Sequence, residues 1–177
     1  VIICIIGVVA YFTGGFTSEF KTFYVTVDGK DIMTDSSGYI IDENQPLTVE
    51  VKYTLGLAGN ENSGYTVKVI PNPVEGKDFG FLVDGEEYSF QSLSNLNAGF
   101  EIEETKGGFT ITPKGSMNDI LQAVFPEQEV EDCTGKGYED MFALIVSSSD
   151  GKSSVTIYFT IFDQTGGVKL DKELLIF

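Results

Sequence analysis

The sequence predicts an all-β fold, an antiparallel sandwich with one short helix, preceded by the end of a transmembrane helix. Three observations indicate this class. Beyond residue 20, apolar residues alternate with polar ones at a period of two, as in half-buried strands. Asp-Gly pairs recur between these runs and favour hairpin turns. The 20 glycines and 14 phenylalanines suit tight turns and aromatic core packing.

Residues 1–12 form an uncharged apolar run, which predicts the outer end of a membrane anchor. A helix needs about 20 apolar residues to cross a bilayer, so we expect this run to be the last part of a longer helix. Gly14 and Gly15 are expected to break that helix before the first charged residues. The expected anchor residues are Val1, Ile2, Ile3, Ile5, Ile6, Val8, Val9, Tyr11 and Phe12.

Two other interpretations of this segment stay open. A signal peptide can be cleaved after Ala10, because Val8 and Ala10 have suitable sizes for the cleavage site. The run of Ile and Val also fits a buried core strand. On the leading interpretation, residues 1–18 are anchor and hinge, and residues 19–177 are one extracytoplasmic domain, because no repeat or low-complexity linker divides them.

The folded part reads as a series of short strands joined by turn signals. The pair 142–146 and 155–162 is apolar on both faces and is expected at the centre of a sheet. In chain order, we expect strands at 23–27 and 31–33 joined by Asp28-Gly29; at 47–53; at 65–69, ended by Pro71; at 79–83 and 87–90 joined by Asp84-Gly85; at 100–102 and 109–111 joined by Gly107-Gly108; at 142–146 and 155–162 joined by Asp150-Gly151; and at 168–177.

One segment has a helical pattern. Ser116 is a suitable N-cap, and Asp119 stands three residues later, where it completes a capping box. Pro126 then ends the helix, which we expect to cross one end of the sandwich. Its apolar face consists of Ile120, Leu121, Val124 and Phe125.

The charge balance excludes several classes of partner. The chain has 27 acidic residues against 11 lysines, a net charge of −16, and this charge repels nucleic acids and anionic lipid surfaces. It favours cations and basic partners. Cys4 and Cys133 are the only cysteines and are not expected to pair, which suits a Gram-positive-type bacterial surface.

No enzyme is expected. Histidine and arginine are both absent, which removes most catalytic triads and leaves Cys133 without an activating base. Adjacent carboxylates in a strand point to opposite faces, so the pairs at 86–87, 103–104, 131–132 and 139–140 are not catalytic pairs by sequence alone. No cofactor is expected, although the oxygen-rich loops at 28–31, 42–44, 60–62 and 131–132 leave calcium open.

The strand pattern, Tyr138 before the strand at 142–146 and the hairpin at 147–154 resemble immunoglobulin-like sandwich domains of bacterial surface proteins. The resemblance covers residues 20–165 and concerns architecture alone. The cysteine pair and buried tryptophan of antibody-type domains are missing. The resemblance implies a role in adhesion, spacing or assembly.

We therefore expect a membrane-anchored, extracytoplasmic interaction or structural module, an accessory subunit of a surface or membrane complex. Its expected partners are other membrane or surface proteins. The alternative is a calcium- or carbohydrate-binding surface module, and a third interpretation is an enzyme with paired carboxylates. An exposed sheet edge can recruit a strand from a partner, and the sequence does not single out the edge.

Overall fold

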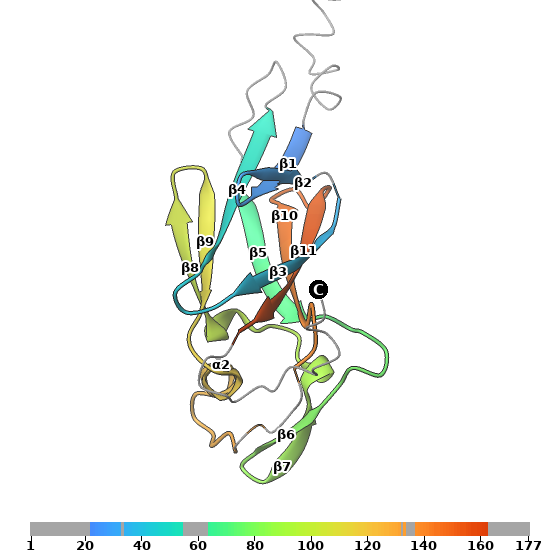
Figure 1. Ribbon diagram of the computed structural model, residues 1–177, viewed down its shortest axis with the longest axis vertical. Helices are drawn as coiled ribbons and strands as arrows, with labels where there is room; N and C mark the ends of the chain where they lie inside the picture. The colour runs from blue at the N-terminus through green and yellow to red at the C-terminus, as the bar shows by residue number, and fades with distance from the viewer. Residues whose placement is uncertain (1–21, 33, 55–63, 132, 134–136, 163–177) are drawn as a thin grey trace, which may run out of the picture.

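The computed structural model describes residues 22–32, 34–54, 64–131, 133 and 137–162 (Figure 1). The described strands are short, and one helix of eight residues accompanies them. In chain order the elements are β1 (Thr22–Val27), β2 (Lys30–Ile32), β3 (Ser36–Ile41), β4 (Leu47–Thr54), β5 (Tyr65–Pro71), β6 (Gly80–Val83), β7 (Glu86–Ser89), the 3-10 turns η1 (Phe90–Ser92) and η2 (Asn97–Gly99), β8 (Phe100–Thr105), β9 (Gly108–Pro113), α2 (Met117–Val124), β10 (Phe142–Ser148) and β11 (Ser154–Ile161).

The described strands form three sheets. A five-stranded sheet has the order β2-β1-β4-β9-β8, and a four-stranded sheet has the order β3-β11-β10-β5. The hairpin β6-β7 forms a separate two-stranded sheet at one end of the molecule (Figure 1). The mostly β, largely antiparallel fold with one short helix is thus confirmed, and β10 and β11 are the two inner strands of their sheet, as expected.

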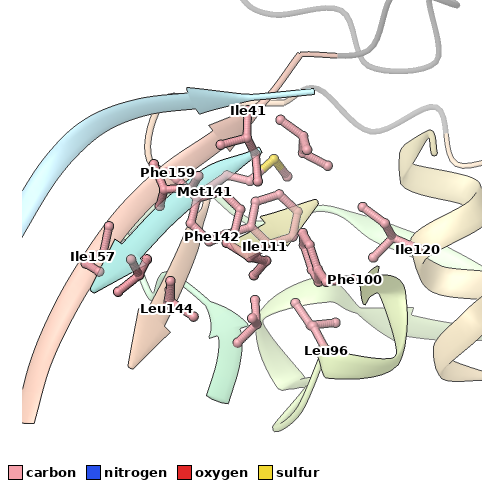
Figure 2. Close-up of a cluster of buried hydrophobic side chains, with 14 of the residues drawn as sticks. Ile41, Leu96, Phe100, Ile111, Ile120, Met141, Phe142, Leu144, Ile157 and Phe159 are labelled. Atoms are coloured by element: carbon pink, nitrogen blue, oxygen red, sulfur yellow. The ribbon is translucent and has the colours of Figure 1, made fainter. Parts of the chain in front are cut away.

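The two larger sheets pack against each other through aromatic side chains. Phe100 of β8 meets Phe142 of β10 and Phe159 of β11 edge-on, with ring centroids 5.5 and 5.7 Å apart. Tyr65 of β5 stacks on Phe109 of β9 at 5.7 Å. Figure 2 shows Phe100, Phe142 and Phe159 gathered with aliphatic side chains from both sheets. Apolar residues of β4, β10 and β11 all contribute to this core.

The first two Asp-Gly pairs form two-residue turns, whereas Asp150-Gly151 lies in a longer loop between β10 and β11, where only Gly151 of the two has positive φ. Asp28 and Gly29 have φ angles of 47° and 79°, and Asp84 and Gly85 have 51° and 80°. Positive φ at both central residues is the mirror-image turn that matches the twist of a hairpin. The register follows, because Val27 lies opposite Lys30 in the first hairpin.

The predicted helix is confirmed as α2. The Ser116 hydroxyl accepts the N–H of Asp119, and the Asp119 carboxylate accepts the N–H of Ser116, which is the predicted capping box. Ile120 packs against Gly99 of η2, where a Cβ atom would collide with the isoleucine side chain. The helix thereby lies against the turn that leads into β8.

Two features differ from the expectation. β3 was not predicted, and it pairs with β11 in parallel, so the fold is not purely antiparallel. The turn between β8 and β9, predicted at Gly107-Gly108, consists of Lys106 and Gly107, because Gly108 already belongs to β9 and is paired with Thr105 of β8. Gly108 is buried, and a Cβ there would collide with the Val49 carbonyl, so this glycine serves close strand contact instead of turning.

Several predictions fall outside the described residues, namely the anchor and hinge at 1–18, the loop at 60–62 and the strand at 168–177. Within the described ranges, no helix has the length and apolar character needed to span a bilayer.

Candidate functional site

Two of the loop carboxylates that suggested calcium accept hydrogen bonds from backbone N–H groups in the structure. Asp42 accepts the N–H groups of Asn44 and Gln45, both at 2.7 Å. Asp28 accepts the N–H of Thr48 at 3.1 Å, which ties the first hairpin to β4. In the part of the chain that the structure describes, no three His, Cys, Asp or Glu side chains are grouped to hold a metal ion.

The carboxylate pairs at 86–87 and 103–104 lie on different strands. Glu86 and Glu87 are exposed neighbours on β7, and Glu103 and Glu104 are exposed neighbours on β8. Asp140 instead supports the parallel strand pair: its carboxylate accepts the N–H of Gly38 at 2.8 Å. Cys133 is buried, and its backbone N–H donates to the Asn118 side chain at 2.7 Å. Asp140 and the backbone of Cys133 thus have local structural contacts.

Asp78 and Tyr138 lie close together near the base of the β6-β7 hairpin. Desolvation alone would raise the pKa of Asp78, but hydrogen bonds from Ser89, Gln91 and Phe79 outweigh it and hold this pKa below its usual value. Burial raises the pKa of Tyr138, and the negative charge of Asp78 adds to the rise while a hydrogen bond with Gln91 opposes it. The Tyr138 hydroxyl donates to the Asn72 carbonyl at 3.1 Å, which joins it to the end of β5.

The edge strands of the sheets differ in how far their outward backbone groups are hydrogen-bonded. A free strand edge presents unpaired N–H and C=O groups that can pair with another chain. Along β5 this edge is closed by the side chain of Asn97. The Asn97 carboxamide accepts the N–H of Val69 at 2.7 Å and donates to the Val67 carbonyl at 2.9 Å. The N–H of Leu96 donates to the Val69 carbonyl at 2.8 Å, so three edge groups are satisfied.

The outer edge of β6 is also covered. Glu131 donates its N–H to the Leu82 carbonyl at 3.0 Å, and the N–H of Asp84 donates to the Glu129 carbonyl at 2.9 Å. Val130 completes the contact as an antiparallel bridge to Val83. The segment after α2 therefore acts as a short third strand beside the hairpin.

β8 is the contrasting edge, at the outer margin of the five-stranded sheet (Figure 1). Antiparallel partners alternate between residues that exchange backbone hydrogen bonds and residues that do not. The N–H of Lys114 donates to the Gly99 carbonyl at 3.0 Å, so Gly99 and Lys114 are a hydrogen-bonded pair. Every second pair along the ladder is then hydrogen-bonded too, which makes Glu101 and Glu103 the residues that bond to β9. Ile102 and Glu104 consequently direct their backbone N–H and C=O groups away from β9. Within the described ranges, no hydrogen bond joins these groups to another segment.

The side chains of this edge are acidic. Glu101 and Glu103 are exposed on the outer face, opposite Thr112 and Thr110 of β9. The ion pairs found among the described residues join Lys52 to Asp31 and Glu50, so the β8 glutamates are in none of them. Glu104 lies on the other face, where its charge adds to the effect of burial in raising the pKa of Tyr65.

The remaining edges are shorter or interrupted. β2 has three residues and β7 has four. β3 has six, but Gly38 adopts a φ of 84° within it and its N–H is taken by Asp140. β8 therefore offers the longest regular open edge in the described part of the chain. Sequence reasoning missed this because an open edge depends on which strands pair, although the alternating Glu101 and Glu103 were a visible signal.

Comparison with known proteins gave no match to a family model, to a curated protein or to a solved structure.

Proposed function

We propose that the chain is a membrane-anchored, extracytoplasmic interaction module with an immunoglobulin-like sandwich, an accessory subunit of a surface or membrane complex. The apolar run at 1–12 supports the anchor, and the two facing sheets support the sandwich. The observation that carries the interaction role is the contrast between edges. Asn97 closes β5 and the segment at 129–131 closes β6, while the regular edge of β8 has no hydrogen-bonding partner among the described residues and is suited to an added strand.

The test is recovery of the full chain from its native membrane after in situ cross-linking and extraction in mild detergent, followed by mass spectrometry. The proposal expects membrane or surface proteins in a fixed ratio to the chain. A variant lacking residues 1–12 is the control, and it is expected to leave the membrane fraction. Recovery of the unmodified chain alone, in a fraction that needs no detergent, would overturn the proposal. Melting curves with and without calcium test the ligand-binding alternative.

A further inference from the structure

We infer that the open edge of β8 binds an extended, basic segment of a partner protein, which adds to the five-stranded sheet as a new strand. In this arrangement, lysine or arginine side chains of the partner face Glu101 and Glu103. The inference rests on the proposed interaction role and names the surface and the chemistry of the partner.

The backbone of β8 is suited to strand addition. Its pairing with β9 runs without a register shift from Phe100 to Thr105, and no residue of the strand has a positive φ. Ile102 and Glu104 each direct one N–H and one C=O outward, which gives an incoming strand two consecutive bonding positions. An extended peptide can satisfy these groups whatever its side chains are, so the backbone alone does not choose the partner.

The side chains of β8 determine which kind of partner strand is favoured. Glu101 and Glu103 lie on the same face of β8, two residues apart, which is the spacing of alternate side chains on an adjacent strand. Their partners on β9 are threonines, so no cation of the described sheet neutralises them. A strand with a cation at every second position places one beside each glutamate, and opposite charges across strands stabilise pairing.

The same charges argue against a second copy of this chain as the occupant. Two β8 edges brought side by side would place the glutamates of both copies together, and like charges in neighbouring strands destabilise pairing. The net charge of −16 adds a long-range repulsion between copies and a long-range attraction for a basic segment.

The first test uses a synthetic peptide that alternates lysine and threonine, with a glutamate–threonine peptide for comparison, added to the full chain in detergent. The lysine peptide is expected to bind saturably and to slow hydrogen exchange at the amides of Ile102 and Glu104. The variant Glu101→Lys/Glu103→Lys is expected to bind it about tenfold more weakly or worse, and to gain affinity for the glutamate peptide. Glu86→Lys/Glu127→Lys, which makes the same charge change outside this sheet, is the matched control.

A second pair of variants tests the backbone contribution separately from charge. Glu104→Pro removes one outward N–H from an edge strand, where proline is tolerated, while Glu104→Gln removes the same charge and keeps the N–H. Binding is expected to be lost in the proline variant and kept in the glutamine variant, with melting curves showing that both fold. Equal binding by these two variants, or equal losses in the β8 double variant and its control, would overturn the inference.

The two proposals fail in different ways. If native partners are recovered with the unmodified chain and equally with Glu101→Lys/Glu103→Lys, the interaction role stands and the β8 site is wrong. If no partner is recovered with the unmodified chain, the interaction role itself fails.

Discussion

At the scale of single residues, polar side chains make hydrogen bonds to backbone groups that have no neighbouring strand. The Asn97 carboxamide presents one acceptor and one donor to β5, as a peptide unit of a neighbouring strand would. Asp42 holds its own loop by accepting the N–H of Asn44, whereas Asp28 and Asp84 accept the N–H groups of Thr48 and Glu129 and so tie their hairpin turns to other segments. The sequence predicted the turns but not these bonds, because acidic loop residues fit calcium ligands, solvated charges and turn acceptors equally well.

Asn97→Ala is expected to lower the free energy of unfolding by about 1–3 kcal/mol, because it leaves a buried donor at Val69 and an acceptor at Val67 without partners. Chemical denaturation followed by circular dichroism measures this loss. Asn44→Ala, at an exposed loop position, is the matched control and should change stability by less than about 0.5 kcal/mol. Equal effects of the two substitutions would contradict the role assigned to Asn97.

Asp78 makes a prediction about acid stability. Its pKa is lowered in the folded state, because the hydrogen bonds from Ser89, Gln91 and Phe79 outweigh the effect of desolvation. Its contribution is therefore fully present above the unfolded value of about 3.9 and is lost as the pH falls through the lower folded pKa. The stability difference between the unmodified chain and Asp78→Asn should be largest near neutral pH and shrink in acid. A difference that does not depend on pH would argue against this.

At the scale of elements, the sequence predicted the helix and hairpins that depend on neighbouring residues. The Asp-Gly hairpins and the capped helix α2 each depend on residues close in sequence, and all of them are present. β3 has no such signal: its Gly38 interrupts the alternation, Ile40 is exposed, and its partner β11 lies far along the chain. The open edge of β8 was unpredictable for a related reason, since it follows from the order of strands in the whole sheet.

The neighbouring glycines Gly107 and Gly108 have different roles, because Gly107 lies in the turn and Gly108 lies in close contact with β4. Gly108→Ala is expected to destabilise the domain by roughly 1–3 kcal/mol, because the new methyl group would meet the Val49 carbonyl of β4. Gly107→Ala has open space around its Cβ position and should be nearly neutral. Thermal unfolding of both variants compares the two positions directly. A larger loss at Gly107 would show that the turn, and not the strand contact, is the sensitive feature.

At the scale of the whole molecule, both sheets depend on one shared core. Val51 of β4 and Ile157 of β11 are 7% and 0% exposed, on opposite sheets. Val51→Asp or Ile157→Asp is expected to unfold the domain, because each buries a charge without a partner. Thr66→Asp, on an exposed position of β5, is the control and should keep a cooperative melting transition. A normal melting curve for either core variant would contradict the observed strand phases.

The excess of negative charge has opposite consequences for folding and for binding. With a net charge of −16 and ion pairs confined to Lys52 among the described residues, repulsion between carboxylates opposes the compact state. Salt shortens the screening length from about 30 Å at 0.01 M to about 8 Å at 0.15 M, so the melting temperature should rise with sodium chloride. The same screening weakens the attraction between β8 and a lysine peptide, whose affinity should fall over that range. The negative charges that repel one another within the domain also attract a cationic peptide, so salt must weaken both effects. If the melting temperature and the affinity for the lysine peptide instead change in the same direction with salt, the peptide is not held by the acidic edge.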